Sequence, residues 1–211
     1  MEILPDIIWH DSIDSTNSEA ARRISELDNL SVIAAMEQTA GRGQGDHKWH
    51  SRPGENLTFT VVLRFGEDSP LGPLAARDNL LVTQITTLAL RRYLLSLGIE
   101  CRIKWPNDIY VGDNKICGIL IENILDGKNV RHSIIGIGLN VNQTDFPEDI
   151  PNPESISRLT GKKYDIKETL RVFRSYIAET ALESGTPGGR ARLAEEFNRY
   201  MFRLEGDTRG L

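Results

Sequence analysis

The stretch from residue 101 to residue 142, CRIKWPNDIYVGDNKICGILIENILDGKNVRHSIIGIGLNVN, decides the fold. Four runs rich in β-branched and aliphatic residues lie within it, at 101–105, 109–111, 115–123 and 130–142. The turn sequences GDN and DGKN separate the last three runs, and short turns of this kind join antiparallel strands. The stretch therefore predicts a sheet built largely from consecutive antiparallel strands.

Further strands and helices are expected on both sides of this stretch. Apolar runs predict strands at 7–10, 31–38 and 56–65. Apolar residues at helical spacing predict helices at 78–97, 166–184 and 190–202. Asp165 is expected to cap the second of these helices. This order predicts an α/β (α+β) domain with a mixed, largely antiparallel sheet flanked by helices, and not a doubly wound nucleotide-binding fold.

Composition narrows the functional classes. The chain has 211 residues, with 25 basic and 30 acidic side chains and a formal net charge of -5, which argues against a nonspecific nucleic-acid binder. Cys101 and Cys117 belong to no CxxC motif, so we expect buried thiols in a reducing compartment. Neither a signal-peptide pattern nor an apolar run of roughly 20 residues is present. We therefore expect a cytoplasmic protein with no nucleic-acid or membrane partner.

A glycine-rich segment, TAGRGQGDHKWHS at 39–51, lies between two predicted strands. It lacks the Lys-Ser/Thr pair of a Walker phosphate loop, and its glycine spacing differs from a dinucleotide fingerprint. His47 and His50 have no further ligand nearby in the sequence to complete a zinc site. A mobile surface loop is the simplest alternative. However, Arg42 between glycines can bind a phosphate or carboxylate, and Trp49 can stack on a planar ring.

A second cluster of polar residues lies in KWPNDIYVGDNKICGI at 104–119. Pro106 interrupts the sheet ladder, which can direct Asn107 and Asp108 into a cleft. Lys104 and Lys115 border the same segment, and Gly118 allows a ligand to approach the backbone closely. The alternative is an ordinary hairpin that carries surface lysines.

The segments DSTN at 14–17 and GIGLNVN at 136–142 each allow two interpretations. Thr16 and Glu19 have the spacing of a capping box, which predicts a helix beginning here. One side chain suffices for a cap, so the others are available to a ligand. In the second segment, two glycines and Asn140 interrupt an apolar strand, which indicates either a bulge or a nearby ligand.

Together, five motifs resemble the biotin–protein ligase family. DSTN, EQTAGRGQGDHKW, KWPNDIY, KICGILIE and GIGLNVN occur in the order and approximate spacing of that family. The resemblance is dense from Asp11 to Asn142 and looser to about Leu204. It implies the fold of the class II aminoacyl-tRNA synthetases and biotin–lipoate ligases.

The resemblance also implies a reaction. Biotin and ATP, with Mg²⁺, would form biotinyl-5′-AMP and pyrophosphate, and a lysine of a biotin carboxyl carrier protein, such as an acetyl-CoA carboxylase subunit, would then take the biotinyl group. The glycine-rich segment would close over the adenylate to exclude water. Some relatives dimerise through sheet edges, so a homodimer is one possible state of the protein.

Residue roles follow from the same resemblance. The biotin-binding set is Ser15, Thr16, Asn17, Gln38, Arg42, Gly43, Gln44, Lys115 and Gly118. The ATP- and adenylate-binding set is Arg42, Trp49, Lys104, Asn107, Lys115 and Asn140. The catalytic set is Lys115, Arg42, Lys104 and Asp108, and Asp108 is also the candidate Mg²⁺ ligand. Cations and Mg²⁺ are needed because the carboxylate and the triphosphate repel each other.

The domain expectation is a catalytic domain at 1–204 and a short tail at 205–211. The small C-terminal β domain of the family is expected to be absent or truncated, and no DNA-binding domain is expected before the catalytic domain. Two alternatives stay open: a lipoate–protein ligase, and a non-catalytic module that binds biotin or docks the carrier.

Overall fold

The computed structural model describes residues 4–45 and 47–202. The strands are β1 (Ile7–Ile13), β2 (Val32–Gln38), β3 (Leu57–Arg64), β4 (Leu74–Ala75), β5 (Arg102–Lys104), β6 (Asp108–Val111), β7 (Asn114–Asp126), β8 (Asn129–Leu139) and β9 (Met201–Phe202). The helices are α1 (Thr16–Arg22), α2 (Leu80–Ser96), α3 (Ile156–Thr160), α4 (Ile166–Ser184) and α5 (Gly189–Tyr200), with a 3-10 turn at Ala76–Asp78.

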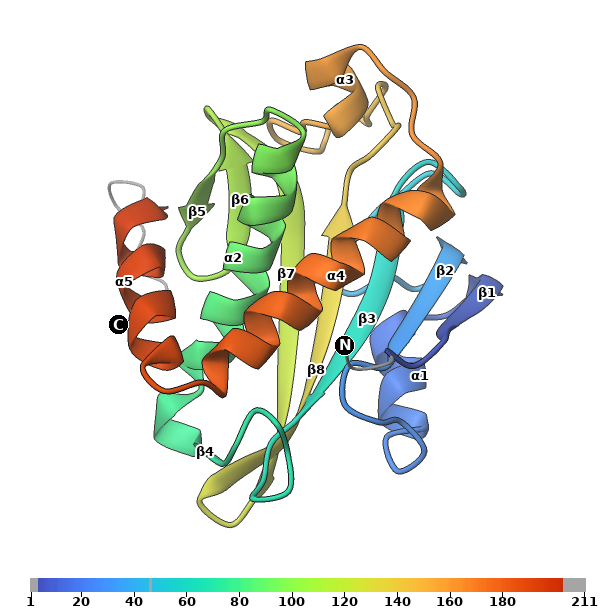
Figure 1. Cartoon of the computed structure of the whole chain (residues 1–211). Helices are drawn as coiled ribbons and strands as arrows, with labels where there is room; N and C mark the ends of the chain where they lie inside the picture. The colour runs from blue at the N-terminus through green and yellow to red at the C-terminus, as the bar shows by residue number, and fades with distance from the viewer. Residues whose placement is uncertain (1–3, 46, 203–211) are drawn as a thin grey trace.

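All the strands form one sheet in the order β1-β2-β3-β8-β7-β6-β5-β9, and β4 pairs with β8 off this path (Figure 1). The pairs β1–β2 and β5–β9 are parallel, and the other pairs are antiparallel. The prediction of a mixed, largely antiparallel sheet is confirmed. The GDN and DGKN turns join β6 to β7 and β7 to β8, as the 101–142 stretch indicated.

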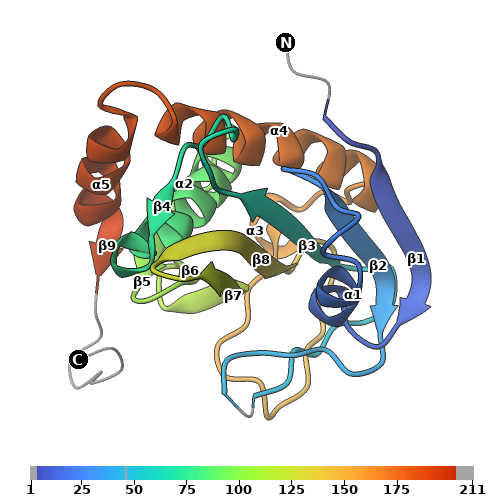
Figure 2. The ribbon, with the colours of Figure 1, turned by 90° about the horizontal axis from the view of Figure 1, so that it is seen from below.

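Helices α2, α4 and α5 cover one face of the sheet, and α1 lies on the other (Figure 2). The main core lies beneath the three helices, where Phe59 of β3 meets Phe173 of α4 edge to face at 5.7 Å between ring centroids. Each large apolar side chain buried in this way contributes roughly 1.5–3 kcal/mol. Cys101 and Cys117 lie in this core as free thiols, as expected. The scaffold that carries the site is therefore stabilised from its helical side.

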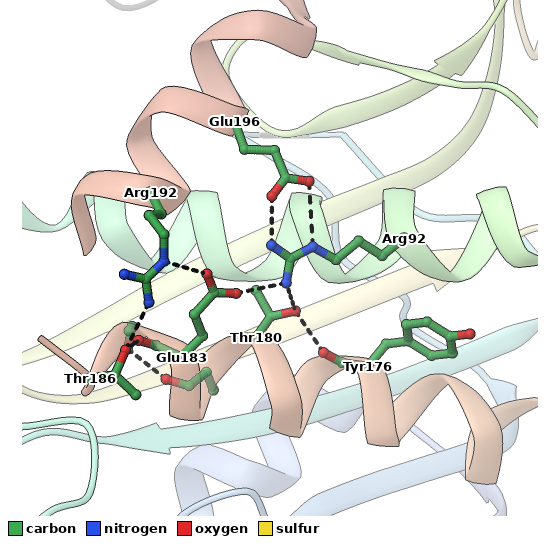
Figure 3. A network of polar contacts seen from close by, with 9 residues as sticks. Arg92, Tyr176, Thr180, Glu183, Thr186, Arg192 and Glu196 are labelled. Atoms are coloured by element: carbon green, nitrogen blue, oxygen red, sulfur yellow. Dashed lines mark hydrogen bonds and ion pairs between the residues drawn. The ribbon is translucent and has the colours of Figure 1, made fainter. Parts of the chain in front are cut away.

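A polar network connects the three covering helices (Figure 3). From α2, Arg92 donates to Glu183 of α4 at 2.9 Å and to Glu196 of α5. The hydrogen bond to Glu196 is the main cause that raises the pKa of Arg92. This network is partly shielded from solvent and joins α2, α4 and α5 beside the core.

Helix α2 begins two residues later and ends one residue earlier than the predicted 78–97, and two other helix ends differ for reasons that the contacts explain. Ser15, not Thr16, is the N-cap of α1, because the Thr16 side chain is bonded to Gln38 instead. At the other end of the chain, the predicted helix at 190–202 stops at Tyr200. The following Met201 and Phe202 pair with β5, since the sheet edge offers their backbone hydrogen-bond partners.

The prediction for α4 and its N-cap is confirmed. Helix α4 spans the predicted residues, and the Asp165 side chain accepts from the Glu168 N–H at 2.8 Å as its cap. The patterns did not predict α3, a single short helix capped by Ser155. The expected tail at 205–211 and the domain boundary at 204 lie outside the described residues. Within the described ranges, no helix combines the length and apolar character needed to cross a membrane.

Candidate active site

A cavity of about 140 Å³ lies on the face of the sheet that carries α1. Helix α1, strands β2, β3, β6, β7 and β8, and the segment between β2 and β3 all contribute to it. The sequence-predicted residues that line it are Ser15, Thr16, Asn17, Gln38, Arg42, Gly43, Gln44, Trp49, Asp108, Lys115 and Gly118. Segments separated by more than half of the chain therefore meet at one pocket.

The floor of the pocket is a patch of glycine on two neighbouring strands. Gly118 of β7 pairs with Gly138 of β8. Gly136 precedes Gly138 by two residues on β8 and lies on the same face of the sheet. A Cβ atom on Gly138 would overlap the Trp49 indole, and one on Gly118 would lie 2.9 Å from its Cζ3 atom. A Cβ on Gly136 would overlap the Asn17 amide. These glycines are required by close approach to other side chains.

One end of the pocket is a chain of buried polar groups. Thr16 donates to Gln38 Oε1 from its backbone N–H at 2.8 Å and its hydroxyl at 3.1 Å. The Thr60 hydroxyl lies 2.8 Å from Thr16 Oγ1 and 2.6 Å from Asn17 Oδ1. Thr16 and Asn17 are each only 3% exposed. Buried groups bonded in this manner present donors and acceptors in fixed directions to a ligand.

Two ion pairs also border the pocket. Lys115 Nζ is 2.9 Å from Asp108 Oδ1, and Arg42 Nη2 is 2.7 Å from Glu122 Oε1. All four side chains are partly exposed, so solvent screens these pairs and each contributes only about 0–1 kcal/mol to stability. The two cations face the same cavity, which is the arrangement that binding an anionic ligand requires.

The glycine-rich segment forms a small hairpin over the pocket. Arg42 and Lys48 form an isolated antiparallel bridge, and the Gly43 N–H donates to the His47 carbonyl at 2.8 Å. The Trp49 N–H donates to the Gly41 carbonyl at 3.1 Å, which places the indole against the glycine floor. Within the described ranges, the buried Trp49 Nε1 has no hydrogen-bond partner. The described residues of the segment, 39–45 and 47–51, therefore lie over the pocket.

Three predicted residues, Lys104, Asn107 and Asn140, are buried beside the pocket but do not line it. Lys104 of β5 lies opposite Asp108 of β6 in the strand register, and its ammonium lies 5.2 Å from the Tyr110 ring centroid. Asn107 donates to the Ile119 carbonyl, and Asn140 donates to the Glu154 carbonyl at 2.9 Å. In this arrangement they connect segments around the site, and their contact with a nucleotide stays a prediction.

Some residues that contact the pocket lining escaped the sequence analysis. Thr60 and Glu122 are examples, since neither belongs to a polar cluster in the sequence. A signal for Glu122 was available: alternate residues of a strand share a face, so counting by two from Gly118 reaches Leu120 and Glu122. Thr60 could be assigned only once β3 was known to pair with β8.

The thiol beside the site is unsuited to catalysis. Cys117 lies between Lys115 and Gly118 in sequence but points into the core and is fully buried. Burial raises the pKa of its thiol well above the usual value. Among the described residues, no group of three or more His, Cys, Asp and Glu side chains is placed to hold a metal ion. The pocket instead brings Arg42 and Lys115 together, each paired with a carboxylate.

The fold and pocket define a class of protein: a mixed-sheet domain in which a glycine-rich hairpin covers a pocket that two cations line. The model of the biotin/lipoate A/B protein ligase family matches residues 9–140. The chain belongs to this family.

Relatives with names and structures agree with this assignment. The bifunctional ligase/repressor BirA of Bacillus subtilis is 36% identical over 197 residues, which cover 86% of this chain and 56% of the relative. The biotin–[acetyl-CoA-carboxylase] ligase of Paracoccus denitrificans is 32% identical over 83% of this chain and 72% of its own length. The biotin protein ligase of Aquifex aeolicus, solved with biotin and ATP, superposes with a TM-score of 0.75 at 27% identity, covering 93% of this chain and 78% of that one. The chain thus spans about half the length of the Bacillus relative.

Proposed function

We propose that this protein is an ATP-dependent biotin–protein ligase. It activates biotin as biotinyl-5′-AMP with release of pyrophosphate, and it then transfers the biotinyl group to a lysine of a biotin carboxyl carrier protein. The observation that carries the proposal is the meeting of Arg42 and Lys115 in one pocket with the polar chain from Gln38 to Asn17. Relatives named as biotin ligases, and one solved with biotin and ATP, support the same reaction.

The polar end of the pocket suits the ureido ring of biotin. That ring needs both donors and acceptors, and Ser15, Thr16, Asn17 and Gln38 supply both kinds within a buried space. Gly43 and Gln44 of the hairpin line the same pocket and would flank the remaining length of the ligand. In this pose the valeryl carboxylate points toward Arg42 and Lys115.

Activation requires the biotin carboxylate to attack the α-phosphate of ATP, two groups that repel each other. Lys115 and Arg42 stabilise the negative charge that develops as the new C–O–P linkage forms and pyrophosphate leaves. Lys104, which lies opposite Asp108 in the sheet, would bind the phosphates of ATP through its ammonium group. Magnesium that arrives with ATP would neutralise phosphate charge, and a single carboxylate such as Asp108 suits an ion held mostly by substrate oxygens. Trp49, Asn107 and Asn140 would contact the nucleotide.

The transfer step needs a neutral lysine on the carrier protein, although free lysine has a pKa of about 10.4. Asp108 lies at the pocket and is already within hydrogen-bond distance of one ammonium, that of Lys115. We propose that it orients or deprotonates the incoming lysine. The free, buried thiols and the use of ATP are consistent with a cytoplasmic protein.

Intact-mass analysis tests the proposal. The purified chain is incubated with biotin, MgATP and an acetyl-CoA carboxylase carrier domain, and the carrier should gain one biotinyl group. Biotin-dependent exchange of labelled pyrophosphate into ATP reports the first step alone. Activation of lipoate in preference to biotin would point to the lipoate ligase, and biotin binding without exchange would point to a non-catalytic module.

A further inference from the structure

Glu122 lies where three segments of the pocket meet. From β7, its Oε1 atom contacts Arg42 Nη2 of the hairpin at 2.7 Å. Its Oε2 atom accepts from Asn17 Nδ2, at the start of α1, at 2.8 Å. The two strongest contacts thus use different oxygens of one carboxylate. No step of the proposed reaction assigns a role to this side chain.

The contact with Asn17 fixes the orientation of a buried amide. An asparagine amide has a donor end and an acceptor end of nearly the same shape. Thr60, on one side of Asn17, carries a hydroxyl that can donate or accept, so it does not determine which end faces it. A carboxylate only accepts, so Glu122 holds Nδ2 toward itself at 2.8 Å and leaves Oδ1 for the Thr60 proton. The Leu120 carbonyl, 3.5 Å from Nδ2, is a longer and weaker second acceptor. The polar end of the pocket therefore takes its direction from Glu122.

The contact with Arg42 has a different consequence. The guanidinium of Arg42 forms an ion pair with the Glu122 carboxylate. If the proposed function is right, on which this inference rests, the carboxylate of biotin seeks the same guanidinium. The two acids then compete for one cation, so Glu122 reduces the affinity that the pocket gains from a ligand carboxylate.

We propose that Glu122 is a positioning residue that orients the Asn17 amide and holds Arg42 across the pocket before the ligand binds. The variant Glu122→Gln separates these effects. The glutamine side chain has one oxygen, which can accept a hydrogen bond from Asn17 or from Arg42. Its NH₂ group then faces the N–H donor of the remaining partner and cannot bond to it. The Asn17 amide then loses its fixed orientation, and Arg42 becomes available to the ligand carboxylate.

The test compares biotin with biotinol, in which a primary alcohol replaces the carboxyl group. Calorimetry on the whole chain gives both dissociation constants for the wild type and for Glu122→Gln. We expect biotinol to bind about tenfold more weakly to the variant, the usual effect of losing a hydrogen bond to a charged group. Biotin should lose less, so the ratio of the biotinol to the biotin dissociation constant should rise by about threefold or more.

A merely structural role would weaken both ligands equally and leave the ratio unchanged, and that result would overturn the inference. Glu26→Gln is the matched control, because it removes a surface ion pair with Arg23, of 3.0 Å, away from the pocket. If Glu122→Gln does not fold, Glu122→Asp keeps the charge but is too short to reach both partners. Its ratio should also rise, and a wild-type ratio would contradict the proposal. A wild-type chain that binds neither ligand would refute the proposed function instead.

Discussion

The two faces of the central strands use the same backbone for opposite purposes. Toward the helices, β3 presents Leu57, Phe59, Val61 and Leu63, all at most 1% exposed, to an apolar core. Toward the pocket, the same strand presents Thr58 and Thr60, which pair with Gly138 and Gly136 of β8. One face stabilises the sheet, and the other gives up side-chain volume so that the Trp49 indole and the Asn17 amide can approach the backbone closely. Stability and binding should therefore respond separately to mutation.

The largest effect is expected on the helical face, from Phe173→Ala. The Phe173 ring is fully buried between Phe59 and Tyr93, with centroids at 5.7 and 5.1 Å. Removing it leaves a cavity, and the free energy of unfolding should fall by about 3–5 kcal/mol, as measured in urea. The biotin affinity of the folded protein should change little. A loss below about 1.5 kcal/mol would mean that the core repacks around the cavity.

Lys115→Ala should have the opposite profile. The Lys115 ammonium faces the pocket, and its ion pair with Asp108 is partly exposed. The free energy of unfolding should therefore change by less than about 1 kcal/mol. Biotin-dependent pyrophosphate exchange should fall by about 10²–10³-fold, because a group that stabilises transition-state charge is lost. Lys128→Ala, in the exposed turn between β7 and β8, is the control and should retain full exchange. Equal rates in the two variants would remove Lys115 from the catalytic set.

Gly138→Ala tests the floor of the pocket. The added methyl group would overlap the Trp49 indole, so the indole must move. We expect overpacking to lower the free energy of unfolding by about 1–3 kcal/mol and the biotin affinity to fall. Trp49 fluorescence, taken as the difference from a Trp49→Phe background, should shift toward the spectrum of an exposed indole. An unchanged spectrum would show that the floor yields and the indole stays.

Asp165→Ala should have the smallest effect and should alter the helical side alone. Asp165 caps α4 by accepting from the Glu168 N–H, and losing such a cap costs about 1 kcal/mol. Thermal unfolding should shift down slightly, while exchange activity stays at the wild-type rate. Lower activity at a temperature where the variant is fully folded would contradict the separation of the two faces.

The sequence predicted the fold well where a signal is local. The run KICGILIEN carries its own strand pattern, GDN and DGKN carry their turns, and Asp165 carries its cap, so each was located without knowledge of the rest. The α5 boundary was misplaced because Met201 and Phe202 pair with β5, which lies about a hundred residues earlier in the chain. Thr16 was assigned a capping role that Ser15 fills, since the partner of Thr16 is Gln38 on another strand.

By itself, the sequence determined the order of the longer strands and helices, the buried thiols, and the family whose motifs it shares. Periodicity, turn residues and caps act over a few neighbours, so they can be recognised without a structure. Only the tertiary structure decided which polar residues share the pocket, that Glu122 joins Arg42 to Asn17, and that Asn107 and Asn140 bond to neighbouring carbonyls. Those relations depend on strand register, because a shift of one residue turns a side chain to the opposite face of the sheet.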